Sequence, residues 1–186
     1  MGRISVWLIL VGLLQGGTHS DYLSAKQKVR AIESDRLKPR TRVTFTSSEI
    51  SAFVAAEARA VVPDGFRDPK VELSEGEVTG TAWIDFGKIR RAQGQQPGWL
   101  LSKLLDGEHP VLVRVRMSSG GGRATVSVLR VEVSGVGLEG RPLDFLIQTY
   151  LKAYYPEAKV DEPFELGHRI DRIEVKPSGA TVVIGR

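Results

Sequence analysis

The residue types that could catalyse a reaction or bind a metal are scarce in this chain of 186 residues, which contains three His and no Cys. His109 follows Asp106 and Glu108 in a turn-like sequence, but these three residues lack the helix or strand spacing of metal-binding motifs. His168 follows a Gly and is interpreted as a surface residue. We therefore predict no catalytic residue, metal or cofactor. The alternative to this prediction is a hydrolase or polymer-modifying enzyme. Such an enzyme would place His109 or His168 in a cleft beside a carboxylate.

The Gly-rich sequence Ser118–Arg123 is another candidate for chemistry. A phosphate-binding loop needs a Lys and the N-terminus of a following helix, whereas these glycines join two strand-like stretches. Gly takes positive φ without steric cost, so we interpret the sequence as a hairpin turn. No Gly-x-Ser-x-Gly sequence occurs, which excludes a nucleophile elbow.

The sequence does favour apolar binding. The stretch Trp99–Leu105 presents a wider apolar surface than one core contact uses, and the small residues Gly80 and Ala82 leave room for a bulky group. The stretch is interpreted either as the lip of an apolar groove or a membrane-touching helix, or as a plug buried beneath a sheet. The predicted ligand-binding residues are Phe53, Gly80, Ala82, Ile84, Trp99, Leu101, Leu104, Leu105 and Ile147.

A long hairpin from Pro110 to Val133 would position these residues. Apolar residues alternate from Val111 to Met117, which is typical of a strand with one buried face. On the return strand the alternation slips at Val128 and Leu129, and two adjacent residues of a regular strand cannot both face the core. A bulge resolves the slip and bends the sheet. We therefore predict a curved antiparallel sheet with a concave apolar face.

Helices are predicted on both sides of the hairpin. Thr46–Glu49 has the form of a capping box, and an apolar stripe follows it to about Val62. Further helices are expected at 21–35 and 142–154, short strands at 42–45, 70–73, 77–86, 170–175 and 181–184, and a surface loop at 90–97. The fold class is α+β: a strongly curved antiparallel sheet packed on one or two amphipathic helices. We expect a single domain at 42–186, preceded by an N-terminal helix and linker at 21–41.

The N-terminus has the pattern of an export signal, with Arg3, the apolar stretch Ile4–Leu14 and a polar stretch before Asp21. The apolar stretch is shorter than the roughly 20 residues of a membrane-spanning helix. We predict a signal peptide at 1–20, cleaved after Ser20, and a soluble periplasmic or extracellular protein; the alternative is an uncleaved anchor or a buried helix. The net charge of +4 favours an anionic membrane or polymer surface over nucleic acid as a binding partner. The alternative is an ordinary mixed-charge surface with no such partner.

The order of these elements resembles that of small exported bacterial proteins of the LmeA and YpmS type, which are similar to the TULIP group of lipid-binding domains. The resemblance begins at about residue 42 and includes the capped helix after Thr46, the strand around Val78–Asp85, the long hairpin and the Gly-Leu-x-x-x-Pro-Leu run at Gly137–Leu143. It implies a curved sheet that wraps a long helix, an apolar groove and a lipid-related role in the cell envelope, without catalysis.

The resulting hypothesis is an exported cell-envelope protein that binds a lipid or other apolar molecule in a groove between the curved sheet and its helices. The alternative is a structural or adaptor module of the envelope, with a packed core and a protein partner. A continuous apolar cavity would favour the first function, and a filled interior would favour the second.

Overall fold

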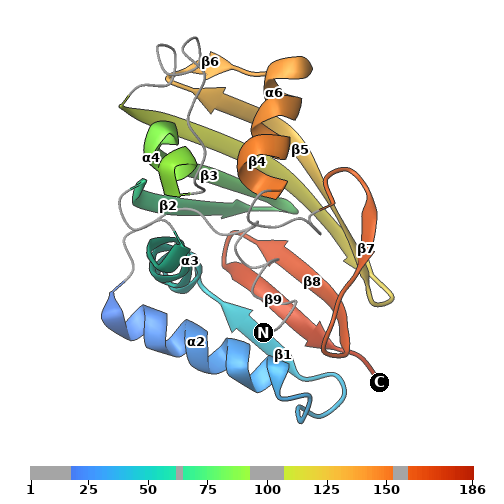
Figure 1. Cartoon of the computed structure of the whole chain (residues 1–186). Helices are drawn as coiled ribbons and strands as arrows, with labels where there is room; N and C mark the ends of the chain where they lie inside the picture. The colour runs from blue at the N-terminus through green and yellow to red at the C-terminus, as the bar shows by residue number, and fades with distance from the viewer. Residues whose placement is uncertain (1–17, 62–64, 93–106, 153–158) are drawn as a thin grey trace.

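A computed structural model describes residues 18–61, 65–92, 107–152 and 159–186 of the chain. It shows an α+β fold in which antiparallel strands form two sheets with helices packed against them (Figure 1). The larger sheet contains β2 (Phe66–Ser74), β3 (Glu77–Asp85), β4 (Glu108–Gly120), β5 (Arg123–Val133) and β6 (Val136–Gly137), with β7 (Pro163–Glu165) paired to β5. The smaller sheet contains β1 (Arg42–Phe45), β9 (Gly179–Ile184) and β8 (Ile170–Lys176). Within the described ranges, no helix combines the length and the hydropathy needed to cross a bilayer.

The larger sheet is curved and is not closed into a barrel. Its longest strand pair is β4–β5. The register shifts within this pair: Arg114 pairs with Arg130, and the next residue, Val115, pairs with Val128. Leu129 is therefore the extra residue of a bulge, which confirms the predicted slip. The turn that joins the two strands contains Gly121 and Gly122 at φ of 60° and 77°, so the Gly-rich sequence is the predicted hairpin turn.

The predicted α+β class with a curved antiparallel sheet is confirmed, and in addition β8 and β9 pair with β1 in a sheet of their own. The two sheets meet through isolated hydrogen bonds instead of a continuous ladder. The Ser119 hydroxyl on β4 donates to the carbonyl of Ile173 and accepts from its N–H, both at 2.8 Å. A side chain here takes the place of a neighbouring strand, and alternation along a single strand does not reveal such a junction.

The main core lies between the two sheets and the helices α2 (His19–Glu33) and α3 (Ser47–Val61). The predicted capping box begins α3, since the Thr46 N–H donates to Glu49 Oε2 at 2.8 Å and the Glu49 N–H donates to Thr46 Oγ1 at 3.2 Å. The apolar stripe that follows is buried at Ile50, Phe53 and Val54. The sequence therefore predicted this helix and its start correctly.

A second capping box begins α2, two residues before the predicted start of that helix. Thr18 Oγ1 accepts from the Asp21 N–H at 3.2 Å, and Asp21 Oδ2 accepts from the Thr18 N–H at 2.7 Å. The predicted cleavage after Ser20 falls between these two residues and would separate the cap from its helix. A mature chain that keeps Thr18 would retain both hydrogen bonds.

Thr18→Ala is expected to lower the free energy of unfolding by about 1 kcal/mol, because the variant loses the side-chain acceptor at the N-terminus of α2. Chemical denaturation followed by circular dichroism measures this change. Gln27→Ala is the matched control, since Gln27 is exposed on the same helix. Gln and Ala are both good helix formers, so this substitution should change the stability little. Equal unfolding free energies for the two variants would contradict a stabilising role of the cap.

The other helices lie at the far end of the larger sheet: α4 (Phe86–Ala92), α6 (Arg141–Leu146) and a π-helical turn η1 (Ile147–Leu151) (Figure 1). The predicted strand to Phe86 ends one residue early, and the predicted loop is helical up to Ala92. The reason is Asp85, whose Oδ1 accepts from the N–H of Lys88 at 2.8 Å and so caps α4. The helix predicted at 142–154 is helical up to residue 152; residues 153 and 154 lie outside the described ranges.

Candidate functional site

Three of the predicted ligand-binding residues lie in the protein interior. Phe53 is buried on α3, where its ring stacks on that of Tyr22 with 6.3 Å between centroids. Gly80 and Ala82 are buried on the inner face of β3, and Ala82 belongs to the same apolar cluster as Phe53. The space that these small residues leave is therefore next to side chains of the main core.

The remaining predicted residues divide between the far end of the sheet and the part of the chain that is not described. Ile84 is half-buried and packs against both the main core and a smaller cluster beyond it. Ile147 is half-buried in η1. Trp99, Leu101, Leu104 and Leu105 lie outside the described residues.

The smaller cluster lies between β4, β5, α4 and the helix formed by α6 and η1. We call it the end cluster: Phe86, Val111 and Val133 are buried, with Ile84, Val113, Leu138, Leu146 and Tyr150 packed against them. The Phe86 and Tyr150 rings meet edge to face at 5.0 Å between centroids. Burial raises the pKa of the Tyr150 hydroxyl, and the hydrogen bond and positive charge of Arg90 act in the opposite direction. The end cluster thus combines an apolar interior with a cation at its edge.

The helix over the end cluster is itself only partly buried. None of the residues in α6 or η1 is buried. Its apolar side chains are all half-buried, namely Leu143, Phe145, Leu146, Ile147, Tyr150 and Leu151. The π-helical turn also changes the helical repeat at Ile147–Leu151, and such turns are frequent at functional sites. This end of the molecule therefore keeps apolar surface that a ligand could cover.

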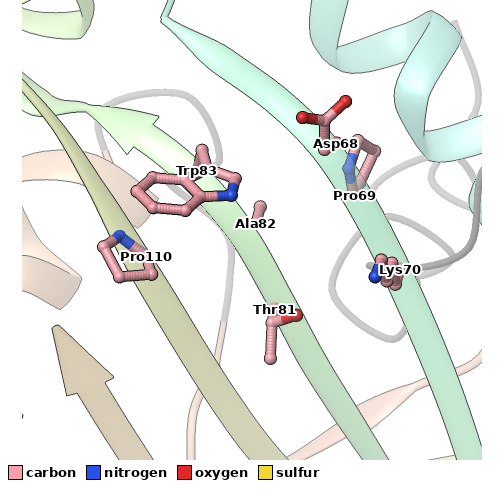
Figure 2. A pocket seen from close by; sticks show the side chains of 7 residues that line it. All are labelled: Asp68, Pro69, Lys70, Thr81, Ala82, Trp83 and Pro110. Atoms are coloured by element: carbon pink, nitrogen blue, oxygen red, sulfur yellow. The ribbon is translucent and has the colours of Figure 1, made fainter. Parts of the chain in front are cut away.

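Besides the end cluster, a concave region lies on the larger sheet at β2 and β3 (Figure 2). It has a volume of about 450 Å³ and is open to solvent, and its lining residues are Asp68, Pro69, Lys70, Thr81, Ala82, Trp83 and Pro110. We call it the Trp83 groove. Trp83 alternates with Ala82 and Ile84 along β3 and so lies on the opposite face of the strand, and it is not among the residues predicted from the sequence to bind a ligand. A large aromatic residue on the polar face was the signal.

His109 and His168, the two histidines that the enzyme alternative would use, lie in different parts of the fold. His109 Nδ1 lies 3.0 Å from the Ser134 hydroxyl at the end of β4. His168 Nδ1 lies 3.4 Å from Asp35 Oδ2, so this histidine does have a carboxylate beside it. Asp35 follows the C-terminal end of α2. Across the described part of the chain, no three His, Asp or Glu side chains gather in a way that would hold a metal ion.

Comparison of the chain with protein-family models, curated proteins and solved structures finds no match in any of the three.

Proposed function

We propose that the protein is exported and binds a lipid or other apolar molecule at the end cluster. The observation that carries the proposal is the incomplete burial of the helix formed by α6 and η1. Leu146 and Tyr150 pack against the buried residues Phe86, Val111 and Val133, yet no residue of the helix itself is buried. A chain inserted between helix and sheet would remove this remaining apolar surface from water, which contributes roughly 25 cal/mol per Å².

The charge at the edge of the end cluster supports a ligand with an anionic head. Arg90 hydrogen-bonds the hydroxyl of Tyr150, and Arg91 is exposed on the next position of α4. A fatty acid or anionic lipid could place its head beside these two guanidinium groups, with its tail against the apolar side chains. The proposal therefore names a ligand with an acyl chain and one negative charge.

Leu146→Glu is expected to weaken binding of a fluorescent fatty acid about tenfold, because it places a carboxylate in the apolar contact and adds repulsion toward the head. Gln148→Glu is the matched control: it adds the same charge to the same helix at an exposed position and should bind like wild type. Fluorescence titration of both full-length variants measures the difference. Circular dichroism establishes whether each variant is folded.

Native purification provides an independent test, in which lipid extracted from the wild-type protein is identified by mass spectrometry. A stoichiometric acyl lipid in the extract is the expected result. No extracted lipid, together with no uptake of the fluorescent fatty acid by wild type, would contradict the proposal.

The second candidate is a structural or adaptor module of the cell envelope. The packing of the main core favours this function. Large side chains such as Phe45, Ile50 and Val126 are at most 2% exposed, and they belong to one continuous apolar cluster. An adaptor needs only a surface for its partner. The lipid experiments separate the two functions, since the adaptor predicts a protein that binds no lipid.

A further inference from the structure

The Trp83 groove is separate from the end cluster and lies on the solvent-facing side of β3. Three neighbouring strands contribute a row of side chains in register, with Arg67 on β2, Trp83 on β3 and Pro110 on β4. Trp83 is 40% exposed, although it lies on an inner strand of the sheet. Figure 2 shows the indole beside Pro110, with Asp68, Pro69 and Lys70 across the groove on β2.

A bulge in β2 forms the groove. Arg67 pairs with Trp83 and Lys70 pairs with Thr81, so the two intervening residues on β2 face the single residue Ala82. The bulge contains Asp68 at a φ of 50° followed by Pro69, and Pro has no N–H to offer to a ladder. Bulges at sheet edges redirect side chains and are frequent beside functional sites.

An ion-pair network fixes one wall of the groove. The guanidinium of Arg67 lies 5.3 Å from the centre of the Trp83 ring and pairs with Glu108 at 2.6 Å and with Asp68 at 2.5 Å. The hydrogen bond from Arg67 lowers the pKa of Glu108, so that carboxylate stays ionised at neutral pH. Because both carboxylates restrain Arg67, the cation that covers part of the indole is held in place and the ring is preorganised.

We propose that the Trp83 groove binds a neutral saccharide, with the C–H face of a sugar ring against the indole and its hydroxyls hydrogen-bonded to Asp68, Lys70 and Thr81. A sugar ring has an apolar face and a rim of hydroxyl groups, and the groove offers the complement of both. The indole and Pro110 are apolar. The carboxylate accepts hydrogen bonds, the ammonium donates them and the Thr hydroxyl does either.

The charge balance of the groove favours a neutral ligand. Its lining holds one cation, Lys70, and one anion, Asp68, and the adjacent Arg67 and Glu108 pair with each other. A phosphate or other anion would meet the Asp68 carboxylate, and a purely apolar chain would remove charged groups from water without replacing their hydrogen bonds. The volume lies within the range of small-molecule sites.

The test is isothermal titration of the full-length protein with three neutral hexasaccharides: β-1,4-linked glucose, β-1,4-linked N-acetylglucosamine and α-1,4-linked glucose. We expect saturable binding of at least one of them, and an increase of about tenfold in its Kd in Trp83→Ala, the loss typical of one stacking ring. Leu129→Ala is the matched control, because Leu129 is also 40% exposed and does not line the groove. It should bind like wild type.

Asp68→Asn provides a second variant that preserves the fold of the bulge, since Asn tolerates positive φ as Asp does. It should raise the Kd for the same saccharide about threefold, the effect of weakening one charged acceptor. Failure of all three saccharides to bind wild type would overturn the proposal, as would unchanged binding in Trp83→Ala. A polyproline peptide that binds through Trp83 in the absence of saccharide binding would reassign the groove to a peptide.

Discussion

Gly179→Ala is expected to destabilise the protein by about 3 kcal/mol, the largest of the stability effects predicted from the structure. Gly179 is the first residue of β9 and has a φ of 148°, and a Cβ there would lie 2.6 Å from the backbone carbonyl oxygen of Phe45 and 3.0 Å from Cγ2 of Thr44. Backbone atoms cannot yield as a flexible side-chain end can. Phe45 is only 1% exposed in the main core, so β1 cannot move away without disturbing that core.

Chemical denaturation of Gly179→Ala measures this cost, and Gly120→Ala is its control. Gly120 lies at the turn between β4 and β5, where a Cβ would meet nothing within 4 Å and φ is outside the left-handed region. The control should change the free energy of unfolding by less than about 0.5 kcal/mol. Similar values for the two variants would contradict the close approach of β1 to Gly179.

The features that sequence predicted well depend on neighbours along the chain. The bulge at Leu129 follows from two adjacent apolar residues in a strand, and only a change of register brings the next apolar residue back to the inner face. The start of α3 follows from Thr46 and Glu49 at capping-box spacing. In both cases the physical cause lies within a few residues of its effect.

The features that sequence reasoning missed depend on contacts between distant segments. The junction between the two sheets includes Ser119, whose hydroxyl contacts the backbone of Ile173, 54 residues further along the chain. The same holds for the Trp83 groove, where the bulge is set by pairing with β3, and Arg67 on β2 reaches across β3 to Glu108 on β4. A pattern within one strand cannot specify such cross-strand arrangements.

The predicted ligand-binding residues illustrate the same limit. Small residues on a strand signal that something approaches closely, but they do not say whether the approaching group is a ligand or the protein's own core. At Ala82 the neighbours include the main core. Ile84 and Ile147 were selected for their apolar character, and the structure places Ile84 against the end cluster and Ile147 in the helix above it.

Glu49→Gln is expected to cost about 2 kcal/mol at neutral pH, because it replaces the charge at the centre of a network that joins α2 to α3. The Glu49 carboxylate accepts from Lys28 Nζ at 2.6 Å, from the Ser24 hydroxyl at 2.5 Å and from the backbone N–H of Thr46 at 2.8 Å. Lys28 Nζ also donates to the Thr44 carbonyl at 2.7 Å. One carboxylate therefore connects both helices and the end of β1.

The contribution of Glu49 should depend on pH with a definite sign. Burial alone would raise the pKa of this carboxyl, but hydrogen bonds from Lys28, Ser24 and Thr46 together lower it below the ordinary 4.5. The folded protein thus binds the proton less readily than the unfolded chain, so the stabilisation is complete above pH 4.5 and is lost as pH falls through the lowered pKa.

Denaturation of wild type and Glu49→Gln from pH 7 to pH 3 tests this linkage. The difference between their unfolding free energies should be constant at neutral pH and should shrink below pH 4.5. Glu75→Gln controls for the loss of one negative charge, since Glu75 is exposed in the turn between β2 and β3 and forms no ion pair among the described residues. A wild-type advantage over Glu49→Gln that persisted unchanged to pH 3 would contradict the lowered pKa, because the carboxylate would then contribute equally in both protonation states.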